Sequence, residues 1–191
     1  MFNITRSLIT AFLIFIFALN NLIAAQESEQ EAYSQALPQL TRLMGSEKAA
    51  REHLSQLWAF SRRADRSFVG LARLTQRVQV AGVNGDYFLQ TTYACGEIAA
   101  ALGADDSEYF SIMLVIFDMK LKNVSAYSGL ESLVQMSVPA YRLLARAIGK
   151  SEEFTKRLVR QDKARVDVAA DALLAMMTDE YRGSIDGRKK K

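Results

Sequence analysis

Apolar residues recur at steps of three and four along almost all of the chain beyond its first 25 residues. This period places them on one side of an α-helix, whereas a half-buried strand requires strict alternation, which no stretch shows convincingly. One typical segment contains Ala140, Leu143, Leu144, Ala147 and Ile148. The pattern therefore predicts an all-α fold.

Residues that favour helix ends divide this pattern into short segments. Glycine readily adopts the left-handed backbone found just past a helix, and it follows apolar segments at Gly45, Gly103 and Gly149. Asp105, with Glu108 three residues later, fits a capping box at a helix start. Capping side chains precede three further segments at Ser46, Asn84 and Ser151. We expect a compact bundle of seven or eight short helices after an N-terminal signal helix.

The hydrophobic pattern also indicates which residues lie inside the bundle. The helix that Asp105 opens is apolar on every side, Leu114 included, so we expect it to be the central, buried helix. The helix after Ser46 is expected to bury Trp58. The last helix, from about 166 to 181, is expected to bury Val168.

The first 25 residues have the order of features of a secretory signal peptide. Arg6 precedes an apolar run over 8–19, two asparagines interrupt it, and small residues end at Ala25. Twelve apolar positions are fewer than the roughly 20 that a membrane-spanning helix needs. We therefore expect cleavage near Ala25 and export to the periplasm or the medium. The alternatives are an uncleaved membrane anchor and an ordinary buried helix.

Beyond the signal, the chain divides into three parts. Residues 26–45 are predicted to form an N-terminal helix interrupted near Pro38, and residues 46–182 the all-α domain. Residues 183–191 lack a helical period, so we expect a flexible basic tail. The tail is interpreted either as a solubility segment or as an attachment to an anionic membrane or a nucleic acid. Its candidate contact residues are Lys189, Lys190 and Lys191.

The composition excludes much chemistry. One cysteine, Cys95, cannot form an internal disulfide, and one histidine, His53, leaves most metal and triad schemes without a partner. We expect Cys95 to be buried and His53 to lie on a helix surface. Glu97 and Asp118 are the best candidates for a carboxylate pair that hydrolyses a glycan. No cofactor, metal or small-molecule substrate is predicted.

Four arginines are spaced as a basic stripe would require if one helix ran through them all. Such a stripe, beside Trp58 and Phe68, could hold an acidic partner or a phosphate backbone. The alternative is a solvated face, with the helix broken around 65–67 or at Gly70. The four candidate interaction residues are Arg62, Arg66, Arg73 and Arg77.

Short motifs occur in a fixed order between Leu54 and Met177. They are Phe68-Val69-Gly70-Leu71, 98–104, Gly129-Leu130-Glu131-Ser132-Leu133, Val138-Pro139-Ala140, 143–151, Leu158-Val159 and Ala172-Leu173-Leu174. In this order the stretch resembles the N-terminal helical module of bacteriophage tail tape-measure proteins. The resemblance implies a series of helix starts, helix ends and core contacts, and it implies no catalytic residue.

The chain also differs from that family. Tape-measure proteins are very long and do not normally begin with a signal peptide, and their glycine-containing turn before the last helix is replaced here by residues 161–164. The resemblance therefore points to a stand-alone, exported relative of the module, derived from a phage and put to another use.

The sequence as a whole favours a non-catalytic, exported protein that binds an unidentified protein partner or acts in assembly. The helices from Ser125 to Met177 are the expected partner surface. Two alternatives stay open. One is a peripheral membrane protein that uses its basic tail, and the other is an extracytoplasmic glycan-acting enzyme that uses a carboxylate pair.

Overall fold

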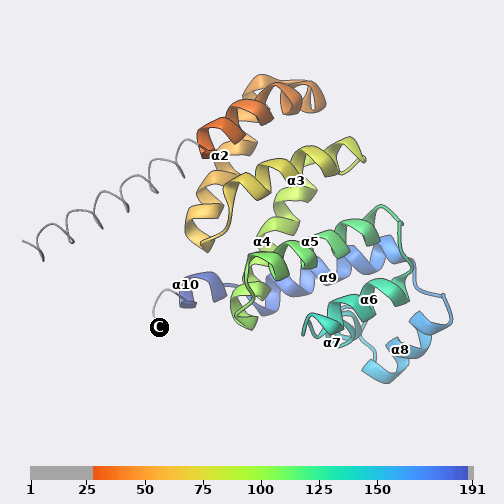
Figure 1. The fold of residues 1–191 in the computed structure, drawn as a ribbon. Helices are drawn as coiled ribbons and strands as arrows, with labels where there is room; N and C mark the ends of the chain where they lie inside the picture. Colours follow the sequence, from red (N-terminus) through yellow and green to blue (C-terminus); the bar gives the residue numbers. More distant parts are fainter. Residues whose placement is uncertain (1–27, 189–191) are drawn as a thin grey trace, which may run out of the picture.

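A computed structural model describes residues 28–188, in which helices are joined by short turns and no strand is present (Figure 1). The all-α prediction is therefore confirmed. Residues 28–44 are helical, and the helices that follow are α2 (Glu47–Ala64), α3 (Phe68–Val80), α4 (Gly85–Leu102), α5 (Asp106–Lys120), α6 (Ala126–Gln135), α7 (Ala140–Ala147), α8 (Glu152–Arg160), α9 (Val166–Glu180) and α10 (Ser184–Arg188). The predicted signal peptide, 1–25, and the lysines at 189–191 lie outside the described residues.

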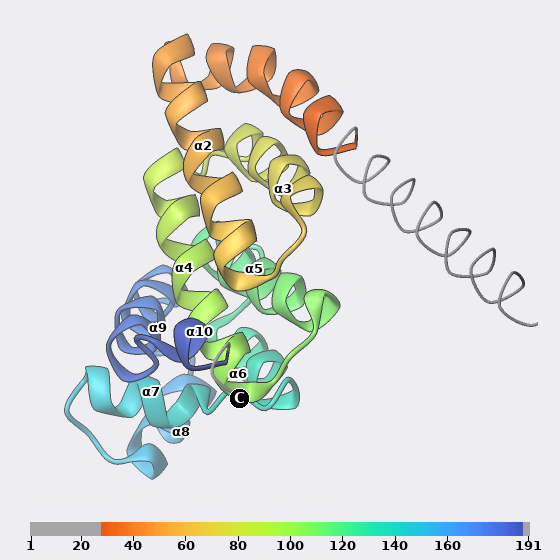
Figure 2. The same cartoon turned by 90° about the vertical axis from the view of Figure 1, so that its left-hand side faces the viewer.

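The helices form a stack with three levels. The helix at 28–44 lies with α2 and α3 at one end, α4, α5 and α9 lie in the middle, and α6, α7 and α8 lie at the other end (Figures 1 and 2). Helix α4 contacts α2, α3, α5, α9 and α10. Small residues such as Ala94, Gly96 and Ala99 are buried along α4, and they allow neighbouring helices to approach it closely.

The central helix is therefore α4, and the prediction that the segment after Asp105 would be central is wrong. Helix α5 packs on α4, α6 and α9, but Leu114 on its outer side is 38% exposed. An apolar residue on every side of a helix does not require burial on every side, because a large share of any protein surface is apolar.

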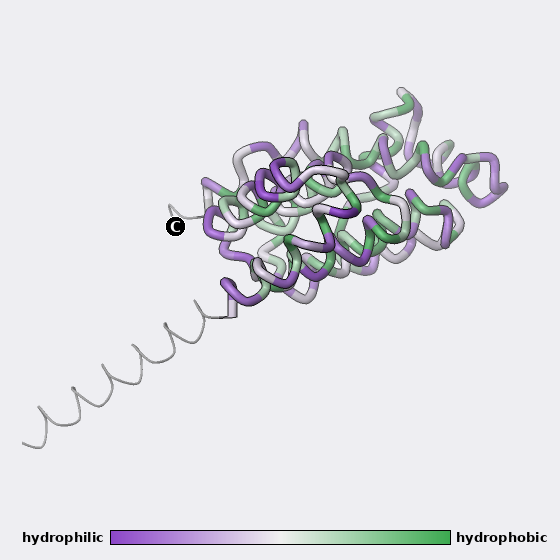
Figure 3. The backbone as a smooth tube through the Cα atoms, turned by 90° about the horizontal axis from the view of Figure 1, so that it is seen from above, coloured by the Kyte–Doolittle hydropathy of each residue, from purple (hydrophilic) through white to green (hydrophobic). Residues whose placement is uncertain are grey.

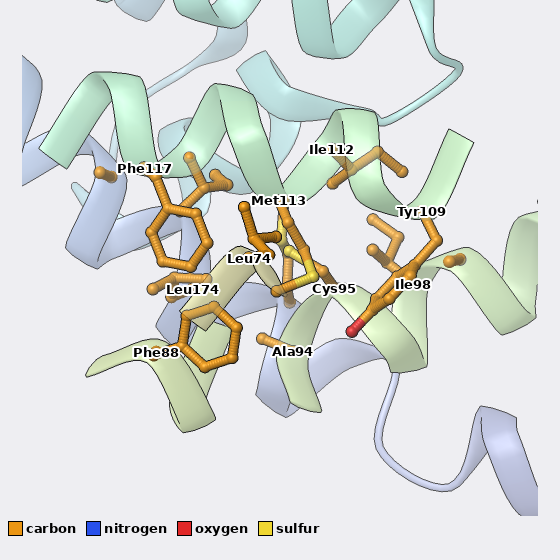
Figure 4. Packing of buried hydrophobic residues seen from close by; sticks show 14 of the residues in the cluster. Leu74, Phe88, Ala94, Cys95, Ile98, Tyr109, Ile112, Met113, Phe117 and Leu174 are labelled. Carbon is orange, nitrogen blue, oxygen red and sulfur yellow. The ribbon is translucent and has the colours of Figure 1, made fainter. Parts of the chain in front are cut away.

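Aliphatic, aromatic and sulfur-containing side chains together fill the middle of the stack (Figure 4). The rings of Phe88 and Phe117 stack with centroids 5.4 Å apart, and Cys95 and Met113 are fully buried beside them. The prediction that Cys95 is buried is confirmed. Burial raises the pKa of its thiol well above the ordinary value, because the thiolate is poorly solvated there.

The helix ends follow the sequence signals closely. Ser46, Asn84 and Ser151 each accept a hydrogen bond from a backbone N–H of the helix they precede. Asp105 and Glu108 form both hydrogen bonds of a capping box. The three predicted glycine stops have positive φ angles, at Gly45, Gly103 and Gly149. Non-glycine residues adopt the same left-handed conformation at Asp65, Lys122, Ser137 and Asp162.

Three predictions about individual positions are wrong. The helix at 28–44 continues through Pro38, because Ala36 and Leu40 on either side of it are fully buried in the core. Trp58 is 46% exposed and Val168 is 52% exposed. Each lies one step outside the buried face of its helix, since α2 buries its neighbour Leu57 and α9 buries 169 and 170.

The prediction that residues 183–191 form a flexible tail is wrong for 183–188. Residues 184–188 form α10, which packs on α2 and α4. Ile185 is 3% exposed, and its backbone N–H donates to Oε2 of Glu97 over 3.0 Å. Asp186 accepts hydrogen bonds from Arg63. One buried apolar residue and these polar contacts hold α10 in place, and the sequence shows no periodic pattern around Ile185 that would have predicted them.

Hydrophilic and hydrophobic residues are interleaved along much of the described backbone (Figure 3). Helices such as α2 bury one side and expose the other, as amphipathic helices do. Within residues 28–188, no helix has both the length and the hydropathy needed to cross a bilayer.

Candidate functional site

The four arginines of the predicted stripe do not share one helix. Helix α2 ends at Ala64, Asp65 turns left-handed, and α3 begins at Phe68. The condition on which the stripe depended is therefore not met. Arg73 and Arg77 are exposed on α3, whereas Arg62 lies on α2 before the break.

Arg66 sits in that break and is buried. Its side chain is only 3% exposed, and its Nη1 contacts Oδ1 of Asp106 at 3.2 Å. Nη2 donates to the carbonyl oxygen of Ala104 over 2.9 Å, and the guanidinium lies over the ring of Tyr109. Arg66 therefore holds the α2–α3 turn against the start of α5. As a residue for binding an external partner, Arg66 was predicted wrongly, because its donors face inward.

The predicted carboxylate pair is also not assembled. Glu97 on α4 is 9% exposed and accepts from Arg63 and from the backbone of Ile185. Asp118 lies near the end of α5 and accepts from Asn123. Helices α4 and α5 are joined by a short turn and pack on each other. Each carboxylate thus has its own partners. Neither carboxylate lines any of the four pockets found at the α2–α3 turn, beside Trp58, before α4 and between α6 and α8.

A groove of about 530 Å³ lies between α6, α7 and α8, within the region predicted to bind a partner. We call it the α6–α8 groove. Its floor is formed by Val138 and Pro139 before α7 and by Tyr141 on α7. Val134 at the end of α6 lines it and is 42% exposed. The remaining lining residues are polar or charged: Glu131, Ser137, Arg142, Glu152, Lys156 and Arg160.

Hydrogen bonds fix most of the charged rim of this groove. The hydroxyl of Tyr141 donates to Oε1 of Glu131 over 2.7 Å, and burial, together with this hydrogen bond, raises the pKa of Tyr141. Lys156 pairs with Glu152 and lies over the ring of Tyr141. Arg142, on α7, binds Glu180 and Tyr181.

Arg160 differs from the other cations of the groove. No hydrogen bond or ion pair joins its guanidinium to another residue of the described chain, although it lies at the exposed end of α8. The α6–α8 groove therefore combines an exposed apolar side chain, Val134, with an available positive charge.

His53 was predicted to lie on a helix surface, and this prediction is wrong. It is 2% exposed, and its Nε2 lies 2.9 Å from the hydroxyl oxygen of Thr75. Burial lowers its pKa to about 4. The sequence did contain a signal, because position 53 falls beside Leu54 and four residues before Leu57 on the buried face of α2.

No group of three or more His, Cys, Asp or Glu side chains within residues 28–188 is arranged to hold a metal ion. Comparison of the chain with protein-family models, with curated proteins and with solved structures gave no match.

Proposed function

We propose that this protein is a non-catalytic interaction protein whose α6–α8 groove binds an acidic segment of a partner protein. The observation that carries this proposal is the exposed side chain of Val134 inside a groove whose rim holds the available cation Arg160. A concave site with an apolar centre and a polar rim is the usual anatomy of a protein-binding hot spot.

The apolar part of the site comes from α6. Tyr127, Glu131 and Val134 are spaced by four and three residues, so they lie on one face of this helix. Tyr127 and Val134 are each 42% exposed. The face continues into the groove floor at Val138 and Tyr141. One apolar side chain of a partner that packs against Val134 would remove it from water.

The charged residues of the groove favour a partner segment that carries negative charge. Three cations line the groove, Arg142, Lys156 and Arg160, against the two carboxylates Glu131 and Glu152. Arg142 and Lys156 already bind carboxylates of this chain. A carboxylate from the partner would therefore bind Arg160 without displacing an existing ion pair. Complementary charge of this kind also speeds association.

We also propose that the protein is an exported, stand-alone relative of the tape-measure module. The support is the order of the sequence motifs and the signal-like pattern of residues 1–25. Three residues of these motifs pack between helices or end one: Gly129 faces Met119, Leu143 is buried, and Gly149 follows the end of α7. These are positions of helix contact and helix termination. Attachment to a membrane through the lysines at 189–191 stays a prediction.

The proposal is tested by affinity capture from extracts of cells that make the protein. Wild-type protein is compared with Val134→Glu, with Arg160→Glu, and with Val168→Glu as a matched control. Val168 is 52% exposed and lies on α9, away from the groove lining. We expect one partner to bind the wild type and the control and to be lost from both groove variants.

Each groove variant should weaken binding by roughly tenfold or more, since interface hot spots contribute about 2 kcal/mol. Far-ultraviolet circular dichroism must show equal helix content in the four proteins. Equal capture by wild type and both groove variants would remove the α6–α8 groove from the proposal.

A further inference from the structure

A second groove, of about 580 Å³, lies at the other end of the molecule, between the helix at 28–44, α2 and α3. We call it the Trp58 groove. Its lining is formed by Glu29, Gln30, Tyr33, Ser55, Trp58, Arg62 and Phe68. Phe68 is buried and stacks against Tyr33 with centroids 6.5 Å apart. The groove thus has an aromatic floor and polar walls.

Trp58 is exposed yet held in place. Its indole N–H donates to Oε2 of Glu29 over 3.3 Å. The same oxygen accepts from Nη2 of Arg62 over 2.6 Å, and that guanidinium lies 5.2 Å from the centre of the indole ring. Nevertheless 46% of Trp58 remains exposed. The structure therefore presents a large apolar ring to solvent in a fixed orientation, which lowers the entropic cost of binding a ligand.

Hydrogen-bonding groups surround this ring. The side-chain amide of Gln30 and the hydroxyl of Ser55 line the groove and are exposed. Within residues 28–188 neither makes a side-chain hydrogen bond, and Oε1 of Glu29 accepts none. Together they offer donors and acceptors beside an apolar face. A ligand that fits must combine an apolar face with a polar edge.

The charges of the groove favour a neutral ligand. The one carboxylate, Glu29, and the one cation, Arg62, are already bound to each other. The positive charge of Arg62 would repel an organic cation, which would also have to displace Arg62 from Glu29, and an anion would have to draw Arg62 away from Glu29. A protein interface is favoured less, because Trp58 is the one large exposed apolar side chain among the described residues of this lining, and stable interfaces bury about 800 Å² per partner.

We propose that the Trp58 groove binds a pyranose ring of a neutral carbohydrate. The carbon-bound hydrogens on one side of such a ring form an apolar face that packs on the indole. The hydroxyl groups at its edge hydrogen-bond with Gln30, Ser55 and Oε1 of Glu29. The volume of the groove is within the range of small-molecule sites. This binding involves no bond cleavage and does not depend on the α6–α8 groove.

The chain itself supplies the probe, since Trp58 is its single tryptophan. The intrinsic fluorescence of the full chain is therefore followed during separate titrations with maltotetraose, fully N-acetylated chitotetraose, tetramethylammonium chloride and inorganic phosphate. We expect a saturable change with at least one of the two saccharides and no saturable change with the two ions.

Variants of the lining residues test whether the fluorescence change comes from binding in the Trp58 groove. Replacing both Gln30 and Ser55 by alanine should weaken saccharide binding about tenfold, because it removes one or two hydrogen bonds and leaves the ring in place. Gln56→Ala is the matched control, since Gln56 is exposed on α2 next to Ser55 but does not line the groove. It should bind as the wild type does.

Three results would overturn the proposal: no saturable response to either saccharide, a response that the double variant leaves unchanged, or a response to tetramethylammonium or phosphate alone. Trp58→Phe, measured by calorimetry because it lacks the fluorophore, checks that the ring itself contributes. If Trp58→Phe instead abolishes capture of the protein partner while no saccharide binds, the groove is a protein interface and the carbohydrate assignment is wrong.

Discussion

Acidification should destabilise this fold through His53. The imidazole is 2% exposed and is enclosed where α2, α3 and α4 meet. It contacts Thr75 on α3 and the ring of Phe88 on α4. Burial lowers the pKa of His53 from the ordinary value of 6.5 to about 4, although the negative charge of Asp86 partly opposes the shift. The folded protein therefore resists protonation of a ring that the unfolded chain protonates readily.

The sign and size of the effect follow from linkage. Between pH 6.5 and about 4 the unfolded state binds more protons than the folded state, so stability falls as the pH falls. The contribution is fully present above pH 6.5 and is lost as the pH drops towards 4. The difference between these two pKa values, about 2.5, corresponds to about 3 kcal/mol of stability. That is a large fraction of a typical folding free energy.

The measurement is the free energy of unfolding by urea, followed by circular dichroism at several pH values from neutral to about 4.5. Carboxylates titrate over part of the same range, so the wild type is compared with His53→Gln, which retains a polar side chain near Thr75. We expect the two stability curves to converge as the pH falls, by about 2 kcal/mol or more. Curves that stay parallel over this range would show that His53 does not titrate as the structure requires.

The remaining predictions concern packing. Gly96→Ala should cost about 2 kcal/mol, because its Cβ would lie 2.5 Å from the fully buried ring of Phe60. Gly187→Ala in α10, where nothing lies within 4 Å of the added Cβ, should cost no stability and can stabilise the helix. Urea unfolding measures the stability of both variants, and equal losses of stability would contradict the packing described. Ile185→Ala should detach α10. Hydrogen exchange at the backbone amide of residue 185 should then accelerate at least tenfold, while the amides of α4 keep their protection. Unchanged exchange would mean that Ile185 does not anchor α10. Cys95 should react with a thiol reagent only when the protein unfolds, and rapid reaction in native buffer would exclude the buried position described.

The helix boundaries could be predicted from the sequence because they depend on local chemistry. The caps at Ser46 and Asp105 satisfy backbone groups a few residues away, and the glycine at 103 adopts a conformation that its own lack of a side chain permits. The residues that make such contacts are close together in the sequence, so the sequence alone can predict them. The left-handed turn at Asp65 was predicted only as one alternative, a break around 65–67, because aspartate favours this conformation less strongly than glycine does.

The site residues could not be predicted in the same way because their roles depend on distant segments. Arg66 is buried only because residues 104 and 106 approach it. The hydrogen bond between Glu97 and the backbone of Ile185 spans 88 positions. The sequence of an amphipathic segment does not show whether its arginine or carboxylate faces water or binds another residue of the chain.

The α6–α8 groove was located only as a region, Ser125 to Met177, because apolar spacing identifies helices but not the gaps between them. Its exposed valine, Val134, has the same periodic position as a core residue would have. In the structure α6 buries residues 126, 129, 130 and 133, so Val134 lies at the edge of the buried face.

The most direct test of the interaction account is site-specific photo-cross-linking in the cells that make the protein. A photoreactive amino acid is placed at position 134 in the α6–α8 groove and, in separate proteins, at positions 160 and 168. The account predicts that 134 and 160 give the same discrete adduct with one partner and that 168 gives none. Adducts that are absent from 134, or equally strong from 168, would contradict it.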